Sequence, residues 1–385
     1  MPFTAIHTYH DVIDYLLDHF GGLEGGRNVK MAKRAILAAY RSLPTVYNWS
    51  YYYKRGRVTS VAAYSTGTIG YDHTGGTYER QVTLTSGTWP SWAARGILRI
   101  SNIDYDVHER KSDTVVTLSA GSNPGADVAS STTYTLSRDA YPLPFDFQSA
   151  DQLRNVDKNW TWPSYVAPGE WLTAHSTREA SNDPRLYTIM ADPDYYGTMS
   201  VYFYPPPSTA HSFDFIYQRG PTPLVVSSYT TGTITVPESS ATVTGDGTTF
   251  NSNMKGSVIQ FGTSTDLPTG LEGLKPYQEQ RTVVAVNSST ELTLDAVVSN
   301  PHTAVKYRIS DIVDIESGAM FEAFISLTEL KLAQLMKDDQ IPLRDQIYSN
   351  NLRLAMQADN RSYGGEMDRP YENIVHLRDY STVTP

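Results

Sequence analysis

An internal repeat constrains the fold of this 385-residue chain more than any other feature of its sequence. The run Tyr64–Ile69, YSTGTI, returns 165 residues later as Tyr229–Ile234, YTTGTI, and Lys111–Leu118 is matched in a similar way by Asn287–Leu294. Both copies mix apolar residues with Ser and Thr, which is typical of short strands separated by turns. Two copies are too few for a solenoid, so the repeat predicts a duplicated small β domain. A chance match between two segments rich in Ser and Thr is the alternative.

Both ends of the chain carry helical patterns instead. Within Arg27–Tyr53, apolar residues recur every three or four positions up to Pro44, which is expected to end the helix. The aromatic run Trp49–Tyr53 then has the composition of a strand. Thr8 and Asp11 have the spacing of a capping box, which predicts the start of an earlier helix. A single amphipathic helix is not stable alone, so other helices must cover its apolar stripe.

The covering helices are predicted near the C-terminus. Phe321–Met336 and Leu343–Asp359 each have a helical apolar pattern, and Pro342 separates them. The fold class that follows is α+β, with a helical bundle formed by the N- and C-terminal helices, a central strand segment and two inserted small β domains. The predicted domains are 1–56, N-terminal helices; 57–139, first β module; 140–227, central segment; 228–311, second β module; 312–365, C-terminal helices; and 366–385, tail.

The central segment is rich in proline and aromatic residues. Met199–Tyr204 and Phe213–Gln218 flank three consecutive prolines, which predicts two strands joined by a stiff turn. Asp192 and Asp194 flank Pro193, a combination typical of a turn rather than of a catalytic carboxylate pair.

No group of residues has the spacing of a catalytic or metal site. Asp104, Asp106 and His108 alternate along one predicted strand, which favours a polar stripe facing solvent over a metal or acid–base group. The chain has no cysteine, which excludes disulfides and thiolate metal ligands. Its net charge of −10 argues against tight wrapping of nucleic acid, and no apolar run is long enough to cross a bilayer. We therefore expect a scaffold without catalytic residues, metal or cofactor, and not an enzyme.

Four segments carry a further pattern: Asn28–Tyr53, a basic helix running into an aromatic strand; Tyr141–Ser149, YPLPFDFQS; Tyr202–Leu224, a strand–proline–strand segment; and Phe321–Gly365, two helices followed by Tyr-Gly-Gly. Together they resemble the head-to-tail adaptor proteins of tailed bacteriophages, in particular the tail tubular protein A family of short-tailed phages. Gly232–Leu294 is similar to small β domains of other phage structural proteins. The two β modules make this chain longer than the compact members of the family.

The resemblance implies a structural protein of the virion neck, between capsid portal and tail, that is in the host cytoplasm during assembly. It implies a dodecameric ring beneath the portal protein, which extends the DNA channel, lets DNA pass without tight binding and attaches a downstream nozzle or tail protein. No membrane is involved. The C-terminal region is then expected to contact the portal or a ring neighbour. The candidate partner-binding residues are Arg353, Arg361, Tyr363, Arg369, Tyr371, His376, Arg378 and Tyr380.

Two other classes of protein stay open. A tail-fibre or glycan-binding protein would form trimers and use exposed aromatic residues such as Trp160, Trp162, Tyr165 and Trp171 as a binding face. A glycoside hydrolase would need two facing carboxylates, which the sequence does not nominate. Terminal helices have no use in either alternative, so they favour the adaptor.

Overall fold

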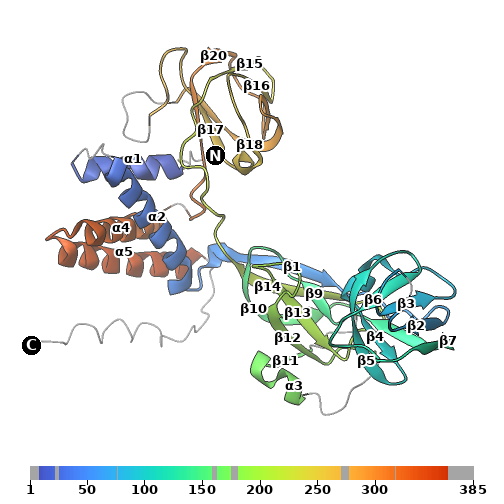
Figure 1. Cartoon of the computed structure of the whole chain (residues 1–385). Coiled ribbons are helices and arrows are strands. Elements are labelled where there is room, and N and C mark those ends of the chain that lie inside the picture. Colours follow the sequence, from blue (N-terminus) through green and yellow to red (C-terminus); the bar gives the residue numbers. More distant parts are fainter. Residues whose placement is uncertain are drawn as a thin grey trace, which may run out of the picture. The chain divides into compact units, whose positions relative to one another are not determined.

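The computed structural model describes residues 8–21, 26–75, 77–157, 163–174, 181–269, 277–316 and 318–362. The chain divides into two compact units. The central unit is Tyr52–Gly220, and the terminal unit combines Met1–Tyr51 with Pro221–Pro385. Figure 1 shows the helices of the terminal unit in blue and red and the strands of the central unit in colours from blue (β1) to yellow-green.

The first module of the central unit is one seven-stranded antiparallel sheet with the order β7-β2-β3-β6-β5-β4-β8. Its strands are β2 (Ile69–Asp72), β3 (Gln81–Leu84), β4 (Ile97–Ile100), β5 (Ile103–Arg110), β6 (Val115–Leu118), β7 (Val128–Thr132) and β8 (Tyr134–Ser137). Tyr64, just before β2, forms a bridge with Leu136 of β8, so the sheet bends nearly into a barrel. Its inner face is a continuous core around Trp89.

Two smaller sheets, here called the central sheets, complete this unit. One has the order β1-β14-β10, and the other β11-β12-β13-β9. Their strands are β1 (Tyr53–Thr59), β9 (Ala140–Pro142), β10 (Phe147–Asn155), β11 (Ser164–Tyr165), β12 (Leu186–Ala191), β13 (Met199–Tyr204) and β14 (Ser212–Arg219). Phe203 of β13 stacks on Phe213 of β14 with ring centroids 4.3 Å apart, so the two sheets share one core. The two strands around the prolines are confirmed, but they lie in different sheets and do not pair with each other.

The second module, in the terminal unit, is a seven-stranded sheet with the order β20-β15-β16-β19-β18-β17-β21. Its strands are β15 (Thr233–Val236), β16 (Thr242–Asp246), β17 (Val258–Phe261), β18 (Glu279–Ser288), β19 (Glu291–Leu294), β20 (His302–Val305) and β21 (Tyr307–Ser310). Strand for strand, this is the order of the first module. An equivalent hydrogen bond also occurs within each copy. The Tyr134 hydroxyl donates to the Thr66 carbonyl at 2.8 Å in the first module, and the Tyr307 hydroxyl donates to the Thr231 carbonyl at 2.6 Å in the second.

The described residues of the terminal unit also form four helices: α1 (Tyr9–His19), α2 (Gly26–Val46), α4 (Ala319–Met336) and α5 (Ile341–Ser362). α4 packs against both α2 and α5, and α1 packs against α2. The predicted capping box is confirmed, since Thr8 and Asp11 exchange backbone and side-chain hydrogen bonds at the start of α1. Pro44 does not end its helix, which continues to Val46, and Ser50–Tyr52 forms a 3₁₀ turn where a strand was predicted.

The predicted fold class is wrong. Strand accounts for 35% of the chain and helix for 27%, and two barrel-like sheets supply most of the strands, so the protein is not a helical bundle with small inserted β domains. The physical reason is that each β module buries a complete apolar core of its own. Such a module needs no helical base for its stability, whereas the helical patterns at the chain ends suggested one.

Candidate functional site

The described part of the structure includes few of the partner-binding residues predicted from the sequence. Arg353 lies exposed on α5, where its guanidinium donates to Asn350 Oδ1 at 3.0 Å. Arg361 belongs to the last turn of α5, and its side chain is outside the described residues. The remaining six lie wholly outside the described residues: Tyr363, Arg369, Tyr371, His376, Arg378 and Tyr380. Partner binding by this set therefore stays a prediction.

The alternating stripe of Asp104, Asp106 and His108 lies on β5, at the second arm of a hairpin with β4. Arg99 of β4 donates two hydrogen bonds to the Asp104 carboxylate, from Nε to Oδ1 at 2.6 Å and from Nη2 to Oδ2 at 3.0 Å. Within the described ranges, no group of three His, Cys, Asp or Glu side chains is placed to hold a metal ion. Among the helices that the structure describes, none is long and apolar enough to cross a membrane.

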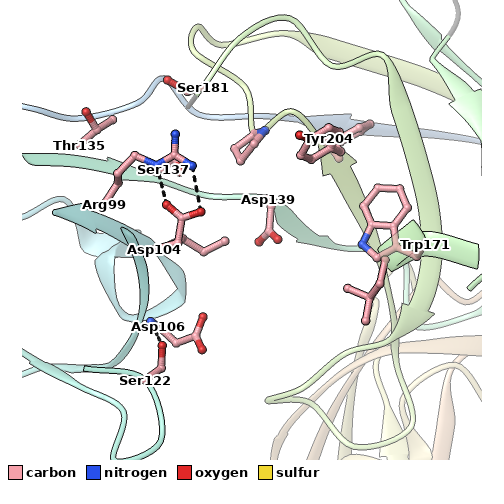
Figure 2. A pocket seen from close by; sticks show the side chains of 14 residues that line it. Arg99, Asp104, Asp106, Ser122, Thr135, Ser137, Asp139, Trp171, Ser181 and Tyr204 are labelled. Carbon is pink, nitrogen blue, oxygen red and sulfur yellow. Dashed lines mark hydrogen bonds and ion pairs between the residues drawn. The ribbon is translucent and has the colours of Figure 1, made fainter. Parts of the chain in front are cut away.

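A pocket of about 420 Å³ opens within the central unit, between the first module and the central sheets. Figure 2 shows the Asp139 carboxylate in the middle of this space, facing the Arg99–Asp104 pair and Asp106 on one side and Trp171 and Tyr204 on the other. The remaining lining residues are Ile97, Ser122, Thr135, Ser137, Leu172, Ser181, Phe203 and Pro206. The pocket thus combines aromatic rings with carboxylates at a junction of two structural layers, which is where binding pockets commonly form.

The pocket wall is acidic. Among the described residues, Arg99 neutralises Asp104, while neither Asp106 nor Asp139 forms an ion pair. Burial is the main reason that the pKa of Asp139 is raised to about 6, and the nearby Asp106 carboxylate adds to the effect. The backbone N–H groups of Asp139 and Ala140 act against this rise without cancelling it. The pocket therefore offers hydrogen-bond acceptors, and among its described lining residues the one cation, Arg99, is paired with Asp104.

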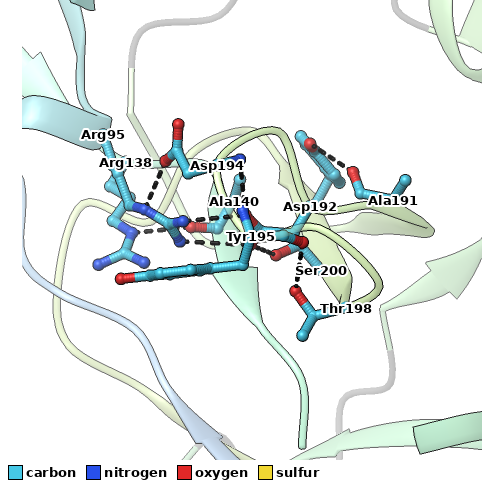
Figure 3. A network of polar contacts seen from close by, with 10 residues as sticks. Arg95, Arg138, Ala140, Ala191, Asp192, Asp194, Tyr195, Thr198 and Ser200 are labelled. Atoms are coloured by element: carbon cyan, nitrogen blue, oxygen red, sulfur yellow. Dashed lines mark hydrogen bonds and ion pairs between the residues drawn. The ribbon is translucent and has the colours of Figure 1, made fainter. Parts of the chain in front are cut away.

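A second polar feature, shown in Figure 3, fixes the turn between β12 and β13. The Asp192 side chain is fully buried and accepts a hydrogen bond from Ser200 Oγ at 2.6 Å. It also accepts from the backbone N–H groups of Asp194 and Tyr195, both at 2.9 Å. Arg95, at the end of the 3₁₀ turn Ser91–Arg95 in the first module, donates to the same carboxylate at 2.9 and 3.3 Å. We call this group the Asp192 latch.

The latch stabilises the charged form of Asp192. Burial by itself raises the pKa of this carboxyl, but the hydrogen bonds from Ser200, from the two backbone N–H groups and from Arg95 outweigh it and lower the pKa to about 2. Arg95 also bonds Asp194 at 2.7 Å and lies 4.6 Å from the centre of the Tyr195 ring. The latch therefore joins the first module to the central sheets and sets the shape of the turn.

The held turn displays tyrosines to solvent. Tyr195 is 58% exposed, and Tyr196 is exposed to the full extent of a free side chain, at 107%. Because a buried charged network sets the backbone of this turn, the turn has less backbone freedom to lose on binding.

The sequence indicated some of these parts and missed others. The Asp192–Asp194 turn is confirmed, and the polar stripe was recognised. The alternation of this stripe did not indicate its contact with Arg99, which arises because Ser101 and Asn102, both with positive φ, form a tight turn that pairs β4 with β5. No sequence signal connects Arg95 with Asp192 or places Trp171 beside Asp139, since these residues lie far apart along the chain.

A comparison with protein families now adds to this geometry. Residues 72–243 match the family model described as SU10 adaptor protein. The matched range starts at the end of β2, runs through the rest of the central unit and includes β15 and the first part of β16. No curated protein sequence matches the chain. The family match confirms the resemblance to phage head-to-tail adaptors that the sequence suggested.

Proposed function

We propose that this chain, a structural protein of the phage head-to-tail adaptor type by its family match, assembles into a ring under the portal. In this role the ring extends the DNA channel and attaches the downstream tail protein. A closed ring of heterologous contacts is the usual way to build such a collar from one chain. The family match over residues 72–243 is the observation that carries the proposal.

The architecture supports a mechanical role. The first module and the central sheets share the Asp192 latch, and each module has a full apolar core, so both units suit rigid spacers. The acidic net charge of −10 suits a conduit that should not retain DNA. Trp171 is 92% buried, which gives no support to its use as an exposed sugar platform in the glycan-binding alternative.

The test is the native mass of the purified protein, alone and mixed with the portal ring of the same phage. We expect a ring-sized complex on the portal, and its loss after deletion of residues 366–385. A protein that stays monomeric at high concentration with portal present would refute ring formation. A stable trimer indifferent to the portal would favour the tail-fibre class, and tight salt-sensitive binding of duplex DNA would refute the passive conduit.

A further inference from the structure

We propose that the Tyr196 turn of one copy inserts into the acidic aromatic pocket of a neighbouring copy, and that this contact joins subunits head to tail. The inference rests on the ring assembly proposed above and names its contact. Both surfaces belong to the central unit, so each copy carries one of each. We call the turn with Tyr196, between β12 and β13, the knob, and the pocket around Asp139 the hole. An interface made from two different patches of one chain is the kind that closes into a ring.

The knob has the properties of an anchor. Tyr196 is fully exposed, and the Asp192 latch holds the turn that carries it. Tyrosine and arginine are the residue types that dominate binding energy at protein interfaces, and Arg95 lies against the neighbouring Tyr195 ring. A buried ion pair is weak evidence for stability, so the latch is better understood as a device that fixes the shape of this turn.

The hole complements the knob in shape and chemistry. Its volume of about 420 Å³ is within the range of sites that bind small groups. The half-buried Tyr204 offers aromatic surface to a phenol ring, and the Asp106 and Asp139 carboxylates are acceptors for its hydroxyl. A phenol is a donor without charge, which suits a pocket whose wall is acidic and holds no free cation among the described residues.

A copy cannot fill its own pocket in this way. The pocket contains Phe203 and Tyr204 at the end of β13, whereas the turn precedes Met199 at the start of the same strand. Five residue steps of about 3.3 Å separate the two by roughly 17 Å. The latch prevents the turn from folding back across that distance, so the occupant must come from another copy. Asp194 and the acidic pocket wall repel each other, and salt is therefore expected to favour the contact.

The absence of cysteine permits a direct cross-linking test in the full-length chain. The double variant Tyr196→Cys/Leu172→Cys places one thiol on the knob and one at the rim of the hole, where Leu172 is 83% exposed. Under mild oxidation we expect a ladder of covalent multimers. A matched control is Tyr196→Cys/Phe145→Cys, since Phe145 is 82% exposed on the same unit but does not line the pocket. This control should give at least about 5-fold less multimer.

Substitutions give a second readout in the wild-type background. Tyr196→Ala should raise the protein concentration needed for assembly by about 30-fold or more, as for an interface anchor. Tyr196→Phe removes only the hydroxyl and should raise it by about 2- to 13-fold. Phe145→Ala, which removes an equally exposed ring, should leave it unchanged. Because both residues are exposed, folding is not expected to change.

The outcomes separate the two proposals. If the wild-type chain assembles on the portal but Tyr196→Cys/Leu172→Cys gives no ladder, and Tyr196→Ala assembles normally, the knob-and-hole contact is wrong while the adaptor function stands. If the wild-type chain never forms a ring, the proposed function itself fails. A ladder that the control pair produces equally well also refutes the contact.

Discussion

Breaking the Asp192 latch should destabilise the central unit strongly. In the variant Arg95→Met, the Asp192 carboxylate keeps its hydrogen bonds from Ser200 and from two backbone N–H groups but loses its cation. Removing one partner of a buried ion pair leaves an uncompensated charge and costs about 3–5 kcal/mol. The lowered pKa of Asp192 reflects Ser200 and the two backbone N–H groups as well as Arg95, so only part of it is lost in this variant. We therefore expect a loss of about 3–5 kcal/mol.

The assay is hydrogen exchange of the β12 and β13 amides in the full-length protein, because a chain with two units need not unfold in one step. Amides of the second module, which lies in the other unit, serve as an internal control and should exchange at an unchanged rate. Arg95→Lys keeps the charge but not the two-pronged contact, so it should have an intermediate effect. The pairing itself is tested by the double variant Arg95→Met/Asp192→Asn, which should cost about 1.5–3 kcal/mol less than the sum of its single changes.

Two results would refute this reasoning. A loss below about 1 kcal/mol for Arg95→Met would show that the carboxylate is not held by Arg95. A coupling below about 0.5 kcal/mol would show that the two side chains act independently. The pH dependence adds a check with a defined sign. Because the folded-state pKa of Asp192 is depressed, its contribution is present in full above about pH 4 and should be lost as the pH falls toward 2.

Three further predictions concern single residues elsewhere. Burial is the main reason that the pKa of Asp139 is raised to about 6, so the folded state gains stability as the pH falls from 6 to 4. In urea titrations, Asp139→Asn should add roughly 1–3 kcal/mol to the free energy of unfolding at pH 7 and should flatten this pH dependence. Arg308 is 9% exposed, and burial lowers its pKa to about 10. Its Nη1 lies 3.9 Å from Asp14 Oδ2, and among the described residues its Nε and Nη1 have no hydrogen-bond partner. Because the Asp14 side chain is 40% exposed and stays solvated without Arg308, Arg308→Met should raise the melting temperature of the second module. Gly67 and Gly232 have φ near +80°, and a Cβ added to them would lie 2.2 Å from the Ser86 carbonyl oxygen and 2.3 Å from the Asp246 carbonyl oxygen, respectively. Gly67→Ala and Gly232→Ala should therefore each lower the free energy of unfolding, measured by calorimetry, by more than about 1 kcal/mol.

Local chemistry explains which elements the sequence predicted well. The capping box at Thr8 depends on residues three positions apart, and the Asp192–Asp194 turn depends on its own backbone, so both are written in short stretches of sequence. The helices α4 and α5 were predicted within a few residues of their bounds for the same reason.

Long-range pairing explains what the sequence did not predict. β14 pairs with both β1 and β10, more than 55 residues away in each case, and nothing in the alternation of its residues identifies those partners. The pocket has the same limitation, because its lining comes from the first module, from the β8–β9 connection, from α3 (Trp171–Ala174), and from β13 with Ser181 and Pro206. The candidate site could therefore be recognised only after the strands were in place.

The two modules place the same face in different surroundings, which is consistent with the proposed pocket. In the first module Ile97 of β4 pairs with Ser137 of β8, and in the second module Val258 of β17 pairs with Ser310 of β21. Because these strands occupy the same places in the two sheets, the two pairs are equivalent. In the second module this face is covered by α1, where the His10 backbone N–H donates to Ser310 Oγ at 3.0 Å. In the first module the equivalent face lines the 420 Å³ pocket. One copy of a duplicated surface is thus covered from within the chain, and the other offers an open pocket, which is the position expected of a surface that a neighbouring subunit covers.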